Sequence, residues 1–254
     1  MNGDACIRHR IEVEFDGAPF AGWQRQDGAL SVQQVLEEAG EQLSGGKTHC
    51  YGAGRTDAGV HAIAMTAHID LAKPMDSWAV MNALNALSRP HPVAVLRAEP
   101  VDDRFHARFS CVERRYLYRL IQRRAPLALD AGRLWQVSHS LDIGLMQKAA
   151  DHLVGHHDFT TFRSVHCQSK SPVKSITEIT VSEDGPEIIV RLRARSFLHN
   201  QVRSIVGTLE RVGAGRWEPG AVKEALDAQD RSRCGPVAPA HGLYFEKAVY
   251  EPAG

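Results

Sequence analysis

The 254-residue chain has few cysteines and no long apolar segment. Its cysteines are widely separated and never share a Cys-x-x-Cys spacing. They are Cys6, Cys50, Cys111, Cys167 and Cys234. Scattered thiols of this kind favour a reduced protein over a disulfide-stabilised one. No apolar run approaches the roughly 20 residues that span a bilayer, and the first residues lack the apolar core of a signal peptide. The sequence therefore predicts a cytoplasmic protein without a membrane segment.

The chain also lacks net charge, because 30 basic residues balance 30 acidic ones. A net charge of zero argues against a nucleic-acid-binding protein. The arginines are nevertheless clustered in two segments, residues 114–124 and residues 191–203, and Tyr116 and Tyr118 lie among the first group. The mixture of arginine and tyrosine favours a local positive cleft. The alternative is a set of solvated strand arginines, each beside an acidic neighbour.

Metal-ligand spacing is absent except for a histidine pair near the end of an expected helix. His152 and His156 stand four residues apart, and His157 follows. No cysteine or carboxylate cluster completes a set of ligands. We therefore predict no metal and no cofactor, and we assign these histidines a structural or surface role.

Periodicity predicts a strand–helix–strand pattern in the first half of the chain. Residues 9–15 alternate as a half-buried strand. A helix with a capping box begins after Ser31. Strands flank a glycine-rich loop at residues 52–62. Asp76 caps a second helix, whose expected apolar stripe contains Trp78, Met81, Leu84 and Leu87.

The second half is expected to repeat this pattern. Strands are predicted at residues 114–122 and 134–137, followed by a helix that Asp142 caps. A hairpin joins residues 173–181 to residues 187–195. Two helices and a closing strand at residues 243–250 complete the chain. We expect an α+β fold of two similar units, with domains at residues 1–108 and 109–254.

The most informative segment is the glycine-rich loop at residues 52–62. Small residues surround one arginine, Arg55, and one carboxylate, Asp57. Only methyl groups or hydrogens crowd that carboxylate, so backbone and ligand can approach closely. A phosphate-binding loop would lie at the N-terminus of a helix. The apolar residues after Gly59 do not repeat at helical spacing. Asp57 is thus either a catalytic carboxylate or a solvated turn residue.

The loop sequence Gly54-Arg55-Thr56-Asp57-Ala58-Gly59-Val60-His61 resembles the signature of the tRNA pseudouridine synthase A family. Further segments match that family in order along almost the whole chain. They are residues 15–17, 22–26, 31–33, 105–110, 114–116, 158–163, 197–203 and 238–243. Phe15 and Gln201 depart from the residues that are common in the family, tyrosine and methionine. Neither departure touches a residue to which we assign chemistry.

The resemblance implies two ferredoxin-like units that share a mostly antiparallel sheet, with an RNA-binding cleft between them. It implies isomerisation of uridine at positions 38, 39 and 40 of the tRNA anticodon arm, by a homodimer. It makes Asp57 the catalytic carboxylate, Arg203 the partner that keeps it ionised, and Tyr116 the active-site tyrosine. Without the resemblance, Arg203 would be a helix arginine extending to solvent, and Tyr116 a core residue.

We predict that Arg55, Tyr116, Arg25 and Arg114 contact RNA. Arg55 is placed to hold a phosphate or to fill the space of an extruded base, although a loop ion pair is the alternative. Two other functions compete with the isomerase. A non-catalytic RNA-binding module or RNA chaperone would not need a carboxylate in its binding site. A carboxylate-dependent hydrolase acting on nucleotides would need a second acid or a metal.

Overall fold

The computed structural model describes residues 7–251, so predictions about Cys6 and the first residues lie outside the described part. The chain divides into two compact units: described residues 7–112 together with 245–251, and residues 113–244. The predicted domain boundary after residue 108 stays a prediction. The mixture of antiparallel strands and helices confirms the expected α+β class.

The first unit is built from six strands and two helices of the described chain. Both helices and five of the strands are β1 (Ile7–Phe15), α1 (Val32–Ser44), β2 (His49–Gly52), β3 (His61–Leu71), α2 (Ser77–Leu87), β4 (Val93–Pro100) and β10 (Leu243–Tyr250), of which the last begins in the second unit.

The strand order β4-β1-β3, with β2 added to β3, and the antiparallel pairing of these strands give a ferredoxin-like βαββαβ arrangement.

 The sixth strand, β5 (Cys111–Gln122), contributes only its first residues to this unit and continues in the second.

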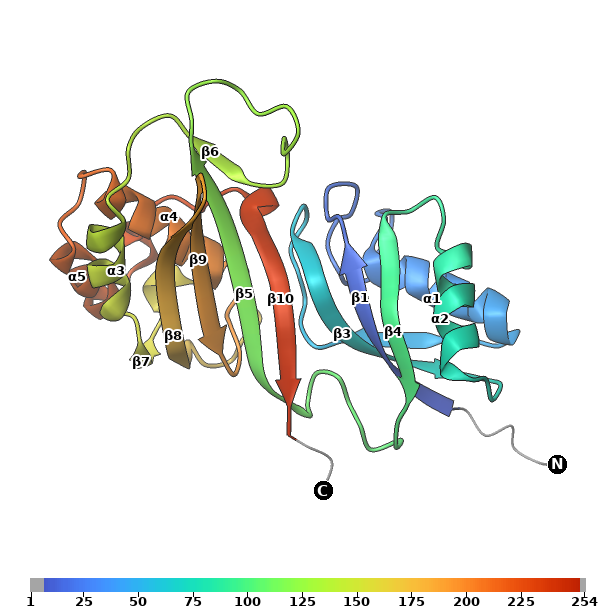
Figure 1. Cartoon of the computed structure of the whole chain (residues 1–254). Helices are drawn as coiled ribbons and strands as arrows, with labels where there is room; N and C mark the ends of the chain where they lie inside the picture. Colours follow the sequence, from blue (N-terminus) through green and yellow to red (C-terminus); the bar gives the residue numbers. More distant parts are fainter. Residues whose placement is uncertain (1–6, 252–254) are drawn as a thin grey trace. The chain divides into compact units, whose positions relative to one another are not determined.

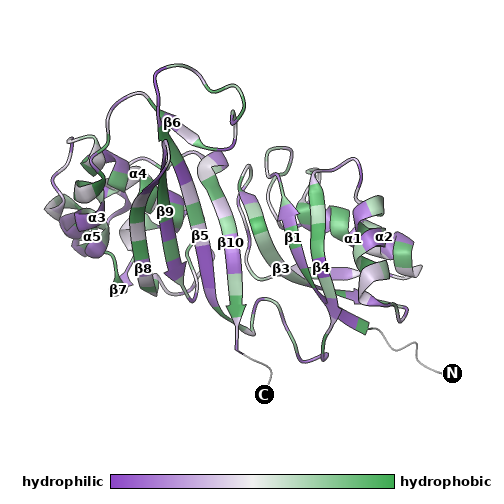
Figure 2. Cartoon of the chain, viewed as in Figure 1, coloured by the Kyte–Doolittle hydropathy of each residue, from purple (hydrophilic) through white to green (hydrophobic). Residues whose placement is uncertain are grey.

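Burial in the first unit follows the alternation predicted from the sequence. Ile11, Val13 and Phe15 on β1 are buried, and the residues between them are half-buried or exposed. Figure 2 shows this as stretches of both colours along the strands. The helices α1 and α2 pack on one side of the sheet, where α1 contacts β2 and β3 and α2 contacts β4 (Figure 1). Ser31 caps α1 by accepting a hydrogen bond from the Gln34 amide at 3.2 Å, as predicted.

The second unit repeats a strand–helix–strand–strand–helix pattern and adds short elements to it. Its strand order is β5-β9-β8-β7, with β6 parallel to β5. The elements are β6 (Trp135–Val137), α3 (Ile143–Asp151), β7 (Gly155–Asp158), η1 (Thr160–Phe162), β8 (Val173–Asp184), β9 (Glu187–Ala194), α4 (Gln201–Gly213), α5 (Gly220–Ala228), η2 (Arg231–Arg233) and η3 (Ala240–Gly242). The predicted hairpin is confirmed, because β8 and β9 pair up to Asp184 and Glu187.

Two expectations about local structure differ from the structure. Trp78 on α2 is 72% exposed and Leu87 is also exposed, whereas Val80 and Leu84 are buried. The predicted apolar stripe of this helix was therefore wrong in part, because α2 turns a different face toward β4 and α1. The strand β7 was not predicted. It has only four residues, and it forms by pairing with β8.

Candidate active site

Asp57 lies on the loop between β2 and β3, as the sequence predicts. The loop is closed at its start by a hydrogen bond from the Ala53 amide to the Thr66 carbonyl, at 2.8 Å. Within it, the Val60 amide donates to the Asp57 carbonyl at 3.2 Å. Asp57 is half-buried and Arg55 is exposed. The two strands thus present both charged side chains on one short, internally bonded loop.

A second segment, residues 16–23, holds this loop from the side. The Trp23 amide donates to the Thr56 carbonyl at 3.1 Å, and the Gly59 amide donates to the Phe20 carbonyl at 3.4 Å. Gly22 has a φ of +111°, and a Cβ at this position would lie 2.4 Å from the Thr56 carbonyl oxygen. A side chain at Gly22 would therefore displace the backbone next to Asp57.

The end of the loop is fixed in the same way. A Cβ at Gly17 would lie 2.1 Å from the Val60 carbonyl oxygen, so only glycine allows this approach. The Gly17 amide donates to Nδ1 of His61 at 3.0 Å. The same nitrogen lies 3.1 Å from a carboxylate oxygen of Asp16. His61 is buried. These contacts explain why two of the matching segments, residues 15–17 and 22–26, accompany the loop signature in the sequence.

Thr56, beside Asp57, has a buried hydroxyl oxygen with no hydrogen-bond partner within residues 7–251. Burying a hydroxyl without a partner costs free energy. The chain retains this cost directly beside the carboxylate. Sequence reasoning named Arg55 and Asp57 but assigned no role to the threonine between them.

Tyr116 lies on β5 in the second unit and is 8% exposed. Its ring packs edge-to-face against Phe197, with centroids 5.1 Å apart and an interplanar angle of 87°. Arg114 is on the same face of β5, two residues earlier. It is also buried, and its Nη1 donates to the Arg195 carbonyl. Both predicted residues therefore have packed rather than solvated side chains.

Arg203 lies in the first turn of α4, and its guanidinium is held by its own unit. Its Nε donates to the Ala238 carbonyl at 2.7 Å, and its Nη1 donates to Oδ1 of Asn200 at 3.0 Å. The Ala238 amide in turn donates to the Arg203 carbonyl at 3.0 Å. The side chain is thus anchored rather than extending freely into solvent.

Tyr118, which the sequence placed in the arginine-rich cleft, is a core residue. It is fully buried, and its hydroxyl donates to the Pro239 carbonyl at 2.7 Å. Burial raises the pKa of this phenol, although the charge of Arg203 acts in the opposite direction. Its hydroxyl is therefore protonated at neutral pH and serves the packing of β5 against residues 239–242.

Several clustered arginines have carboxylate partners, as the alternative interpretation of the sequence held. Arg119 binds Glu187 through two hydrogen bonds of 2.6 and 2.8 Å, which raise the pKa of the arginine. Two further pairs join Arg115 to Glu113 at 2.7 Å, and Arg193 to Glu178 at 2.8 Å. These arginines carry compensated charge.

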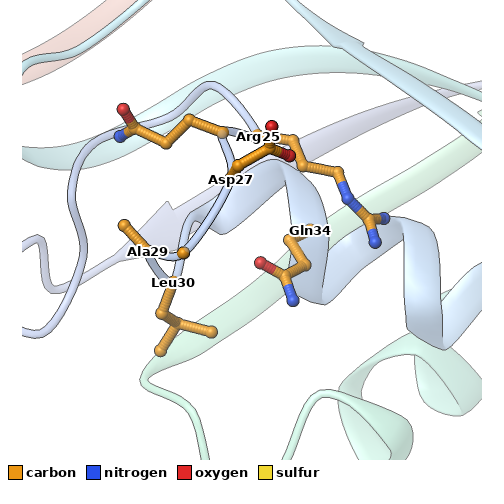
Figure 3. A pocket seen from close by; sticks show the side chains of 7 residues that line it. Arg25, Asp27, Ala29, Leu30 and Gln34 are labelled. Carbon is orange, nitrogen blue, oxygen red and sulfur yellow. The ribbon is translucent and has the colours of Figure 1, made fainter.

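Arg25 lies at the edge of an open hollow of about 360 Å³, lined by residues 25–30 and Gln34 (Figure 3). Its guanidinium extends toward α1, where it lies 3.2 Å from Glu37 and 3.7 Å from Glu38. Glu37 is buried and also accepts the Cys50 amide at 3.1 Å. Arg25 therefore neutralises a carboxylate that ties α1 to β2.

The predicted residues fall in both units. Arg25, Arg55 and Asp57 belong to the first unit, and Arg114, Tyr116 and Arg203 belong to the second. In each unit the structure brings two of them onto one element: Arg55 and Asp57 on the same loop, and Arg114 and Tyr116 on β5.

The described residues contain neither a metal-binding cluster nor a membrane-spanning helix. Among residues 7–251 no group of three or more histidine, cysteine, aspartate or glutamate side chains is placed to hold a metal ion. Nδ1 of His156 lies 2.8 Å from the Ser175 hydroxyl, and Nε2 of His157 lies 2.9 Å from the Val154 carbonyl. No helix within the described residues has the length and apolar character needed to cross a bilayer.

A family profile and several related proteins all point to the same protein family. The sequence profile described as tRNA pseudouridine synthase matches residues 11–110 and 149–251. A protein named tRNA pseudouridine synthase A from Maricaulis maris is 57% identical over 243 residues, which cover 96% of this chain and 98% of that protein. Proteins of the same name from Parvibaculum lavamentivorans and Cereibacter sphaeroides are 55% and 56% identical, each over 96% of this chain, and over 99% and 96% of their own lengths.

Proposed function

Because the chain belongs to the tRNA pseudouridine synthase family, we propose that it isomerises uridine to pseudouridine at positions 38, 39 and 40 of the tRNA anticodon arm. The reaction breaks the bond between the ribose and N1 of uracil and remakes it to C5. The C5 proton is released and N1 gains a proton, so the composition of the nucleotide is unchanged and nothing is oxidised or reduced. The required groups are a carboxylate, a cation close to it, and a pocket in which the detached base turns.

Asp57 is the proposed carboxylate. As a nucleophile it adds to the uracil ring or attacks the ribose carbon, and as a base it removes a sugar proton. The observation that carries this proposal is the support of its loop. Backbone hydrogen bonds from Ala53, Trp23 and Gly59 hold the peptide on both sides of Asp57, which supports a main chain that is ordered at Asp57 before substrate binds.

Arg203 is proposed as the cation that keeps the carboxylate ionised, because an opposite charge nearby lowers a carboxyl pKa. Its anchoring to Ala238 and Asn200 supports a fixed direction for the guanidinium. Tyr116 is proposed to stack on the uracil and to relay a proton through its hydroxyl. The edge-to-face contact with Phe197 supports a fixed ring plane for such stacking.

For RNA binding we favour Arg55, which is exposed and lies two residues before Asp57. It would hold a phosphate or fill the space of the extruded base. Arg25 and Arg114 are proposed contacts as well, and both have protein partners in the structure. Arg25 pairs with Glu37 and Glu38, and Arg114 donates to the Arg195 carbonyl. The proposal also keeps the homodimer implied by the family resemblance, which light scattering with and without tRNA tests.

The deciding experiment replaces Asp57 with asparagine, which keeps the size of the side chain and removes its charge. Pseudouridine formation on an unmodified tRNA transcript should fall by at least the roughly 10²–10⁴-fold typical of losing an acid–base group. The affinity for tRNA should stay equal or rise, because a negative charge near the phosphates is removed. A thermal melt of the variant confirms that it is folded before the rates are compared.

The same experiment separates the isomerase from an RNA-binding module. A folded Asp57→Asn protein that forms pseudouridine at the wild-type rate would refute the catalytic role of Asp57. A wild-type protein that binds tRNA and forms no pseudouridine at all would instead support the non-catalytic alternative.

A further inference from the structure

A cluster of aromatic side chains in the first unit has no role in the proposed chemistry. It consists of Tyr51 on β2, His68 on β3, and His106 and Phe109 on the segment after β4. We call this cluster the aromatic platform. The Tyr51 and His68 rings are stacked, with centroids 5.1 Å apart at 22°. His106 lies 4.6 Å from His68 and 4.4 Å from Phe109.

The outer rings of the aromatic platform are exposed. Phe109 is 72% exposed and Tyr51 is 44% exposed, whereas His68 is fully buried. Burying an aromatic side chain is favourable, so leaving Phe109 in water forgoes that stabilisation. The buried His68 ring therefore packs against the inner face of the Tyr51 ring, and the Phe109 ring is exposed to solvent.

The backbone around Phe109 is ordered before any partner arrives. Nδ1 of His106 accepts hydrogen bonds from the Arg108 and Phe109 amides, at 3.1 and 3.4 Å. The Ser110 amide donates to the His106 carbonyl at 2.9 Å, and the Ser110 hydroxyl accepts the His106 amide at 3.0 Å. Because the segment is already folded, binding through its rings would lose little conformational entropy.

A positive group accompanies the rings. The guanidinium carbon of Arg108 lies 5.6 Å from the centre of the Phe109 ring. Arg108 is exposed on the same turn of chain as that ring. An aromatic face beside an arginine is complementary to nucleic acid, because a base stacks on the ring while the cation attracts the phosphate.

The platform is also connected to the Asp57 loop through a short length of chain. Tyr51 precedes Asp57 by six residues on the strand that leads into the loop. Six residues span at most about 21 Å when fully extended. An RNA whose target nucleotide is bound at Asp57 therefore has other nucleotides within reach of Tyr51 and Phe109.

We infer that the aromatic platform is a second RNA-binding site, where an unpaired base of the substrate stacks on Phe109 and Tyr51 while Arg108 contacts the adjoining phosphate. This inference rests on the proposed function for the identity of the substrate. It gives a role to residues 105–110, a matching segment to which the chemistry assigns none.

The test compares variants of Phe109 with a matched control. Phe109→Ala and Phe109→Leu both remove the stacking face and should weaken tRNA binding by about 5- to 150-fold, the range that losing one base–aromatic stack gives. Phe109→Tyr keeps the face and should bind normally. Trp78→Ala is the control, because Trp78 on α2 is equally exposed, at 72%, and lies outside the platform. It should not change the affinity.

Two further measurements complete the test. The rate of pseudouridine formation at saturating tRNA should be unchanged in Phe109→Ala, while KM rises. Light scattering of each variant measures its oligomeric state at the concentration of the binding assay. Unchanged affinity in Phe109→Ala would overturn the inference. An affinity loss in Phe109→Ala that accompanies dissociation into monomers would also overturn it. So would wild-type affinity in Phe109→Leu, because a leucine preserves an apolar contact but no stacking face. Both outcomes assign the platform to contact with a second copy of the chain.

If the wild-type protein forms no pseudouridine, the proposed function fails, but the affinities of these variants still decide whether the platform binds RNA.

Discussion

At the scale of single residues, the glycines of residues 16–23 matter as much as the charged side chains of the loop. Gly17 and Gly22 lie where any Cβ would overlap a carbonyl oxygen of the Asp57 loop. The sequence suggested that small residues surround Asp57, and it identified the matching segment that contains Gly22. It could not show that these glycines contact the loop, because the contact joins Gly22 to Thr56, 34 positions further along the chain.

Replacing Gly22 with alanine should therefore damage the proposed active site without unfolding the protein. The new Cβ would lie 2.4 Å from the Thr56 carbonyl oxygen, and a φ of +111° is strained for alanine. We expect the free energy of unfolding to fall by about 1–3 kcal/mol. We also expect the rate of pseudouridine formation at saturating tRNA to fall by about tenfold or more, because a displacement of about 1 Å is costly in an active site.

The matched control is Gly28→Ala. Gly28 also has a positive φ, of +75°, but a Cβ there would meet nothing within 4 Å. This variant should lose about 1 kcal/mol of stability to backbone strain alone and keep its catalytic rate. Equal rates in the two variants, measured by single-turnover kinetics, would mean that the contact between Gly22 and Thr56 does not position Asp57.

At the scale of elements, segments with strong local signals were predictable and those that depend on pairing were not. The alternation of β1 and the caps at Ser31, Asp76 and Asp142 are local features, and the structure confirms them. The strand β7 contains two histidines and only four residues, so its identity depends on its pairing with β8. Likewise, the apolar residues of α2 are spread around the helix, and tertiary packing selects the buried face.

The connection between β3 and residues 101–110 gives a prediction about pH. Nδ1 of His68 accepts a hydrogen bond from the Ala107 amide at 3.1 Å. Burial lowers the pKa of His68 to about 4, and the charges of Arg8 and His106 act in the same direction, against that of Asp70. Burial, together with the charge of Arg8, also lowers the pKa of His106. Hydrogen bonds and the charge of Arg8 lower the pKa of Asp70, although burial raises it.

Because the folded pKa of His68 lies below that of the unfolded chain, the unfolded state binds the proton first as pH falls. The free energy of unfolding should thus decrease between pH 6.5 and about 4, by on the order of 2–3 kcal/mol from this residue. His68→Gln keeps an acceptor for the Ala107 amide and removes the titration. Urea unfolding from pH 4 to pH 7 should show a shallower decrease in that variant. Parallel curves for the two proteins would contradict a buried, neutral His68.

At the scale of the whole molecule, the absence of net charge means that RNA binding depends on a few local cations. Formal charge is zero, and Arg115, Arg119 and Arg193 lie in ion pairs with carboxylates. The sequence shows that these arginines lie in two clusters along the chain. It does not show which carboxylates pair with them. Glu187 is 68 residues from Arg119 in the sequence, and it becomes its partner only when β5 pairs with β9.

The dependence of tRNA affinity on salt should distinguish compensated arginines from those that contact phosphate. Each phosphate contact contributes about 0.7–0.9 to the slope of log affinity against log salt. Arg55→Gln should make the slope shallower by the contribution of about one contact, because Arg55 is exposed two residues before Asp57. The double variant Arg119→Gln, Glu187→Gln removes an ion pair and leaves the net charge unchanged. It should therefore keep the wild-type slope.

Arg119→Gln alone is a poorer comparison, because it leaves the Glu187 carboxylate without its partner and adds repulsion. If the double variant flattens the slope as much as Arg55→Gln does, Arg119 contacts phosphate in the complex despite its pairing with Glu187, and the original interpretation of the arginine cluster as a cleft is the correct one.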